Sequence, residues 1–193
     1  MFISVINGAA QMPGADVTLA AMAWRPHAQI GEHHPAGKVI AAHDLTGRDL
    51  VFVLSRTALS GPGVMICRAC DAARNPAIFR IDEVCFPVGA IAHRHSHAGA
   101  GIRHLIRGAL RVETAGEDTI IATGESWYEP AGTPVRAVAL HSRGVTSFVR
   151  AMVIPAAYEG KSTFALADAA DAKLPRLQTT HRHIDLPLQR DAG

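Results

Sequence analysis

Three histidines at alternate positions, His93, His95 and His97, are the side chains best placed to do chemistry. Successive side chains on a β-strand point to opposite faces, so an unbroken strand would project all three imidazoles from one face. Neighbouring imidazoles in such a column stand about 7 Å apart along the chain. Two of them can therefore lean toward one ion, and neutral imidazole is a ligand that transition metals favour. The pattern predicts a metal site made by His95 and His97, with His93 as a candidate third ligand.

The histidines lie in a long region of short strands separated by glycine-containing turns. Apolar runs rich in β-branched residues recur along it, and no long segment shows helical periodicity. The runs cover residues 39–42, 50–54, 64–66, 78–84, 90–97, 103–106, 109–113, 119–122, 135–140 and 146–154. Many short strands at such intervals predict an all-β sandwich or barrel.

Two glycine-anchored signatures surround the histidines. They read Gly89-x5-His95-x-His97-x3-Gly101-x6-Gly108 and Gly124-x5-Pro130-x-Gly132-x2-Val135. This layout resembles the paired motifs of the cupin superfamily. The resemblance implies a double-stranded β-helix, or jelly-roll barrel, that forms homodimers and holds a metal or a small molecule inside.

Two positions depart from the family pattern. Gly101 stands where cupins place a ligand glutamate, and Val135 stands where they place a further histidine. Carried over residue by residue, the resemblance gives only His95 and His97 as ligands. It therefore implies a weak or incomplete site for one divalent transition metal, which would be Fe, Zn, Ni or Mn.

Several side chains are candidates to complete that site. His93 has the right alternation, although the strand would have to bend for all three histidines to reach one ion. His104 faces outward unless a β-bulge intervenes, and Glu129 faces inward only if the turn re-aims it. His141 lies nearer the other end of the barrel. The sequence leaves the third ligand open.

Two residues are candidates for binding a ligand in the barrel. Arg103 shares the alternation of Gly101, so the resemblance implies that it faces the cavity, where a guanidinium would bind a carboxylate or phosphate. Tyr128 is a second candidate, chosen by residue type alone. The preferred hypothesis is a protein that binds a small, anionic organic molecule.

The main alternative is a metal-dependent dioxygenase of the Fe type, or a related oxidoreductase, because the histidines would leave coordination positions open. An isomerase using histidine as a base and a module that serves only assembly are further alternatives. Fold class does not choose among these functions, so the sequence leaves open whether the protein is an enzyme.

The chain divides by composition into three parts. We expect an irregular N-terminal arm over residues 1–37, a cupin barrel over 38–155 and a C-terminal tail over 156–193. The polar stretch 177–186 is expected to be extended and to pack on the barrel or on a partner subunit.

The composition of the chain argues against binding to nucleic acid or to a membrane. A formal net charge of +2 over 193 residues is too small for a nucleic-acid surface. No apolar run approaches the roughly 20 residues that span a membrane, and no basic residue precedes Arg25 to form an export signal. We therefore expect a cytoplasmic protein that binds neither nucleic acid nor membrane. Cys67 and Cys70 are interpreted as small buried apolar residues.

Overall fold

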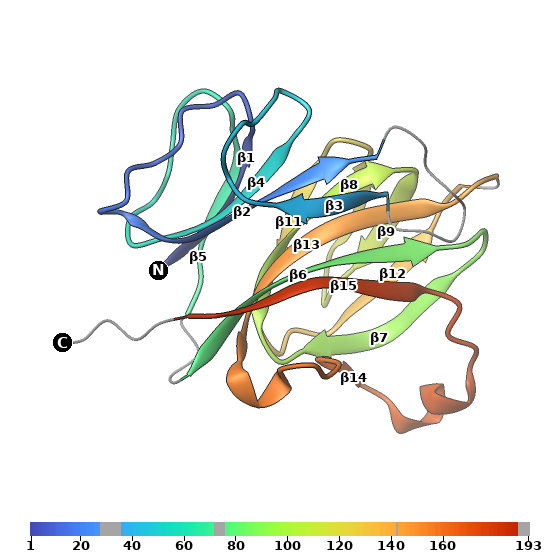
Figure 1. Cartoon of the computed structure of the whole chain (residues 1–193). Coiled ribbons are helices and arrows are strands. Elements are labelled where there is room, and N and C mark those ends of the chain that lie inside the picture. The colour runs from blue at the N-terminus through green and yellow to red at the C-terminus, as the bar shows by residue number, and fades with distance from the viewer. Residues whose placement is uncertain (28–35, 72–75, 142, 189–193) are drawn as a thin grey trace.

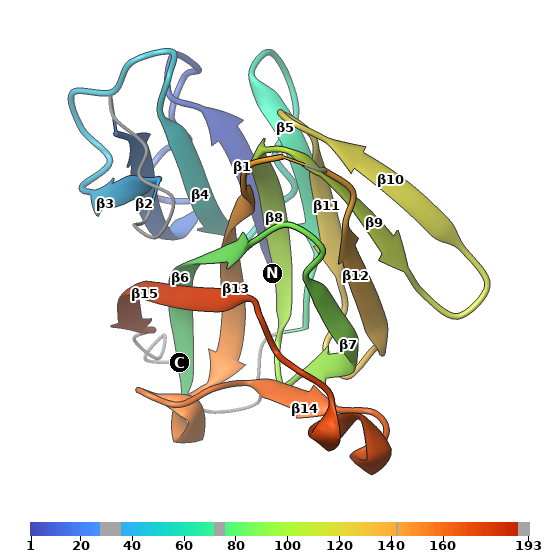
Figure 2. The ribbon, with the colours of Figure 1, turned by 90° about the vertical axis from the view of Figure 1, so that its right-hand side faces the viewer.

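The computed structural model describes residues 1–27, 36–71, 76–141 and 143–188, which form three five-stranded antiparallel sheets. The two views in Figures 1 and 2 show the sheet from the first third of the chain lying against one side of a barrel made by the other two. The predicted all-β fold with a jelly-roll barrel is confirmed.

The first sheet has the strand order β3-β2-β4-β1-β5. Its strands are β1 (Phe2–Asn7), β2 (Thr18–Pro26), β3 (Gly37–Ile40), β4 (Leu50–Ser55) and β5 (Val64–Ala69).

The second and third sheets form the barrel. The second has the order β10-β9-β12-β7-β14 and contains β7 (Ile91–His97), β9 (Ala109–Glu113), β10 (Asp118–Ala122), β12 (Val135–Ala139) and β14 (Phe164–Leu166). The third has the order β11-β8-β13-β6-β15 and contains β6 (Ala77–Phe86), β8 (Ala100–Arg107), β11 (Ser126–Glu129), β13 (Thr146–Pro155) and β15 (Thr179–Pro187). Two 3₁₀ helices, η1 (Ala156–Tyr158) and η2 (Ala169–Lys173), flank β14.

Strands β6, β8 and β13 of the third sheet are buried on both faces. One face lines the barrel interior, and the other packs on the first sheet. Phe52 and Leu54 of β4 meet Ile81 of β6 and Val149 of β13 in that outer core. A strand buried on both faces favours apolar residues, and β13 is an apolar run with one charged residue, Arg150. In β6 the apolar residues are interrupted by Arg80, Asp82 and Glu83, which are buried with polar partners.

Three predictions about the ends of the chain need correction. Residues 1–37 are not an irregular arm, because β1 and β2 pair with β4 in the first sheet. Strands β3, β4 and β5, assigned to the barrel by the 38–155 boundary, belong to that same sheet. The tail contributes β14 and β15 to the barrel sheets. Whether the chain has separate domains at the predicted boundaries stays a prediction.

The expectation that 177–186 is extended and packs on the barrel is confirmed by the pairing of β15 with β6. A buried carboxylate, Glu83 of β6, also joins this strand to the first sheet. Its Oε2 accepts hydrogen bonds from Trp24 Nε1 at 3.3 Å and from His183 Nε2 at 3.1 Å. One side chain therefore ties the first sheet, the barrel and the tail together.

Within the part of the chain that the structure describes, no helix has the length and apolar character needed to cross a membrane. The homodimer and the cytoplasmic location stay predictions.

The packing of the first sheet on the barrel leads to a stability prediction for Phe52→Ala. The ring is fully buried between the two, so its removal should cost about 3–5 kcal/mol of unfolding free energy in a urea titration. Ile120→Ala is the control, because that side chain is 65% exposed and should change stability by less than about 0.5 kcal/mol. Equal effects of the two substitutions would contradict the proposed packing.

Candidate functional site

A cavity of about 150 Å³ lies inside the barrel, between the second and third sheets. Strands β6, β8, β11 and β13 line one wall, and β7, β12 and β14 line the other. Residues 176–182 of the tail complete the lining. The barrel therefore has an interior space large enough for a small molecule.

The lining changes from charged to apolar along β6. Arg80, Asp82, Val84 and Phe86 all face the cavity, as the alternation of a strand requires, whereas Ile81 packs outward on the first sheet. The same strand thus gives the cavity a charged part and an apolar part.

A β-bulge decides which histidines enter the cavity. Val135 of β12 pairs with His95, and Ala137, two residues on, pairs with Ala92 instead of His93. The extra residue on β7 breaks the alternation, so Ala92, His95 and His97 line the cavity. The predicted single face for all three histidines is wrong: His93 lies outside the lining, and its Nε2 donates to Pro175 O at 3.3 Å.

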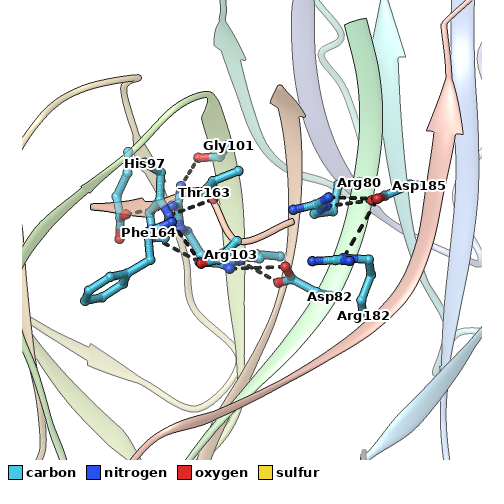
Figure 3. A network of polar contacts seen from close by, with 12 residues as sticks. Arg80, Asp82, His97, Gly101, Arg103, Thr163, Phe164, Arg182 and Asp185 are labelled. Atoms are coloured by element: carbon cyan, nitrogen blue, oxygen red, sulfur yellow. Dashed lines mark hydrogen bonds and ion pairs between the residues drawn. The ribbon is translucent and has the colours of Figure 1, made fainter. Parts of the chain in front are cut away.

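His97 is held by a buried polar network, which Figure 3 shows in part. Arg150 of β13 donates from Nε and Nη2 to the two carboxylate oxygens of Asp82. Its Nη1 lies 3.0 Å from His97 Nε2, and His97 Nδ1 lies 3.0 Å from Thr163 Oγ1. Because a guanidinium only donates, Nε2 of His97 is the acceptor and Nδ1 carries the proton. Burial, followed by the charges of Arg150 and Arg103, lowers the pKa of His97 far below its usual range, so the ring is neutral.

His95 is also neutral at pH 7. Its Nδ1 donates to the carbonyl of His93 at 2.7 Å, and its ring stacks on Phe164 with centroids 4.2 Å apart. Burial is the main cause that lowers the pKa of His95 to about 4. The site is therefore a pair of uncharged imidazoles beside charged arginines.

Arg103 lines the cavity, as the sequence predicted, and its hydrogen-bonding capacity is only partly used. The side chain is 1% exposed and its Nη1 donates to Gly101 O at 2.6 Å. Nη2 lies 2.6 Å from Glu129 Oε2, which is an ion-pair distance, but Nη2 and Nε have no hydrogen-bond partner of acceptable geometry among the described residues. Burial lowers the pKa of Arg103 to about 10, so it remains charged at neutral pH.

Strand β11, which the sequence did not predict, places Trp127 and Glu129 in the cavity and Tyr128 on its other face. Tyr128 packs on the core between the barrel and the first sheet, and burial raises the pKa of its phenol. The assignment of Tyr128 to ligand binding therefore does not agree with its position. Glu129 points inward as strand alternation requires, and it accepts a hydrogen bond from Trp127 Nε1 at 2.8 Å.

The region that carries this geometry matches a known family. Residues 82–147 match the model of the cupin domain, and this segment holds both signatures and most strands of the cavity wall. The chain therefore contains a cupin domain over these residues, as the resemblance of its two signatures predicted.

Solved structures similar to this cupin share little sequence with it. An RmlC-like cupin from Shewanella frigidimarina is 16% identical over 41% of this chain and 68% of its own, with a TM-score of 0.37. An oxalate oxidase is 16% identical over 40% of this chain and 46% of its own, with a TM-score of 0.36, so the match spans less than half of that protein. KdgF from Halomonas sp. is 23% identical over 44% of this chain and 86% of its own, with a TM-score of 0.31. No curated protein matches the chain.

The residues at the cupin metal position do not fit a metal. In cupins the two histidines of the first signature would offer lone pairs to the ion, but here Nε2 of His97 accepts a hydrogen bond from Arg150. A divalent cation at that position would face the positive charges of Arg150 and Arg103. The electrostatics of this cupin therefore oppose a cation between His95 and His97.

The positions of the other family ligands agree with this result. Val135 lines the cavity with an apolar side chain. A Cβ at Gly101 would lie 2.5 Å from Ala151 O, so the backbone leaves no room for a glutamate there. Among the residues that the structure describes, no group of three histidine, cysteine or acidic side chains is arranged to hold a metal ion.

Sequence reasoning missed Asp82 and Arg150. Each is a charged residue inside a predicted apolar strand, and buried charges require a partner. Arg150 is the one charge in its predicted strand, but Asp82 shares its own with Arg80 and Glu83, so the sequence did not say which acid pairs with Arg150. The lining residues of the tail, such as Gln178 and Arg182, do not stand out in the sequence because they come from a polar segment. Cys67 and Cys70 are free thiols. Cys70 is buried, as predicted, whereas Cys67 is only partly buried.

The first prediction from the site concerns Asp82→Asn. Removing this carboxylate leaves the buried guanidinium of Arg150 without its counter-charge, which should cost about 3–5 kcal/mol of unfolding free energy. The exposed Asp118→Asn variant is the matched control and should be nearly neutral. Urea titration measures both, and a loss below about 1 kcal/mol for Asp82→Asn would argue against the pair as a structural centre.

The second prediction concerns pH and uses His104, which lies outside the cavity lining and contacts Ser126 Oγ at 2.8 Å. Burial lowers the pKa of His104 to about 4, whereas an unfolded histidine titrates near pH 6.5. Between these values the unfolded state binds more protons, so stability should fall as pH decreases from about 6.5 to 4. The His104→Gln variant should lose less stability over that window, by up to about 3 kcal/mol. Parallel curves for the two proteins would contradict the assignment.

Proposed function

We propose that this cupin binds a small organic anion in its barrel, with Arg103 as the main anchor and Arg150 as a second positive charge. The anion would occupy the region in which the family pattern places a metal. The proposal concerns binding and assigns no reaction.

The observation that carries the proposal is the incomplete hydrogen bonding of Arg103. A buried donor without an acceptor costs free energy, and the cost is greater when the donor is charged. Nε of Arg103 is such a donor. Nη2, on the same edge of the guanidinium, also lacks a hydrogen bond, although it forms an ion pair with Glu129 Oε2 at 2.6 Å. That edge is the one to which a carboxylate binds through two parallel hydrogen bonds.

Other buried arginines of the cavity differ from Arg103 in this respect. Arg80 donates from Nε and Nη2 to Asp185 and from Nη1 to Lys161 O. Arg150 uses all three nitrogens on Asp82 and His97. The guanidinium nitrogens of these two side chains are all hydrogen-bonded within the protein, whereas Arg103 has no hydrogen bond at Nε and only an ion pair with Glu129 at Nη2.

The charge of the lining also favours an anion. The described residues around the cavity include five arginines, at positions 80, 103, 150, 176 and 182, against two acids, at positions 82 and 129. His95 and His97 add no negative charge. Arg80, Arg103 and Arg150 are buried, so their charges act on a bound group with little screening by water, whereas Arg176 and Arg182 are exposed and contribute less.

The alternative function, a metal-dependent dioxygenase, has less support. It needs the lone pair of His97 Nε2 for a metal, and that lone pair is directed to Arg150. The substitution of two family ligands by Gly101 and Val135 points the same way.

The proposal predicts the effect of Arg103→Met on anion binding. Isothermal titration with a panel of small carboxylates should show at least one acid that binds the unchanged protein. Arg103→Met should lower the affinity for that acid by about 10- to 100-fold, the amount expected for the loss of hydrogen bonds to a charged group. Arg103→Lys should recover only part of the affinity, because an ammonium keeps the charge but lacks the planar fork.

The control is Arg111→Met, since Arg111 is a partly exposed arginine outside the cavity lining. Unchanged affinity in Arg103→Met would contradict the anchor. A stoichiometric transition metal in protein purified without chelator or nickel resin, lost on replacing His95 and His97 by alanine, would overturn the proposal as a whole.

A further inference from the structure

The cavity has a charged row and an apolar row side by side. In the third sheet Asp82 pairs with Arg150, which pairs with Arg103. Two residues along the same strands, Val84 pairs with Phe148, which pairs with Leu105. Two residues on a strand span about 7 Å, so a molecule bound at the arginine row reaches the apolar row within that distance.

Aromatic and aliphatic side chains extend this apolar end. The Trp127 and Phe148 rings meet edge to face with centroids 5.2 Å apart, and Phe86 lies 6.0 Å from Phe148. Leu110 and Ala137 line the cavity from the second sheet. The indole N–H of Trp127 already donates to Glu129, so this end offers a ligand apolar contact rather than hydrogen bonds.

One polar atom of the tail lies in the same cavity without a partner. Gln178 is part of the lining, and its Oε1 is buried and accepts no hydrogen bond from the described residues. A buried carbonyl oxygen is normally satisfied, so a ligand that carries an O–H or N–H donor would complement it.

We infer that the ligand is a monocarboxylate with an apolar body of about the size of a benzene ring and a hydroxyl group. The carboxylate binds Arg103 at Nε and shares Nη2 with Glu129. The body lies against the apolar row that contains Phe148, and the hydroxyl donates to Gln178 Oε1. The whole cavity measures about 150 Å³, the volume of an engineered apolar cavity that holds benzene, so one ring is the upper limit for the body. This inference rests on the proposed anion binding and adds the chemical class of the anion.

The test compares phenylacetate with acids and an amide that each change one feature, using titration calorimetry on the full chain. Propionate lacks the ring, succinate replaces it with a second carboxylate, and phenylacetamide lacks the charge. Each should bind at least 10-fold more weakly than phenylacetate. Mandelate and 4-hydroxyphenylacetate carry a hydroxyl at different positions, and one of them should bind about 3- to 10-fold more tightly than phenylacetate.

A variant of the tail isolates the hydroxyl contact. In Gln178→Leu, the affinity for the tighter-binding of the two hydroxylated acids should fall to the affinity for phenylacetate. The matched control is Gln11→Leu, because Gln11 is exposed. Retention of the preference in Gln178→Leu would overturn this part of the assignment.

The outcomes separate the inference from the function on which it rests. If propionate or succinate binds as tightly as phenylacetate and loses affinity in Arg103→Met, the apolar body is wrong and anion binding stands. If phenylacetamide binds as tightly as phenylacetate, the charge is irrelevant and both ideas fail. Failure of all these acids to bind would count against both.

Discussion

The buried ion pair of Asp82 and Arg150 is the interaction on which the site depends. It joins the two central strands of the third sheet, β6 and β13, at their inward faces. The pair compensates two charges that would otherwise be costly inside a barrel. It also directs the remaining nitrogen of Arg150 at His97, which fixes the tautomer of that ring, and burial together with this charge keeps the ring neutral. The chemistry open to the cavity follows from this arrangement.

A cupin barrel is here combined with an electrostatic field opposite to that of a metal site. The two histidines of the family signature are retained on the inner wall, but arginines lie beside them and the positions of the other ligands are glycine and valine. The histidines then act as neutral hydrogen-bonding and stacking groups, to Arg150, Thr163 and Phe164. Retention of a sequence motif in this fold therefore does not by itself retain the chemistry of the motif.

The additions on both sides of the family segment shape the barrel differently. The first sheet covers the outer face of β6, β8 and β13, so these strands have no solvent-exposed side. The tail pairs with β6 through β15 and with β7 through β14, and it places Arg176 above the ring of Phe164 at 3.9 Å. The N-terminal addition supports the cavity from outside, whereas the C-terminal addition forms part of its lining.

The sequence alone determined the strand pattern of the barrel, the inward positions of His95, His97 and Arg103, and the family. These features follow from local alternation and from glycines at fixed spacing, which a single segment encodes. Tertiary structure decided the rest. The bulge that turns His93 outward depends on pairing between β7 and β12, and the pairing of Asp82 with Arg150 joins residues 68 positions apart. The roles of the first sheet and the tail depend on which strands they meet, and such long-range pairing leaves no periodic signal in either partner.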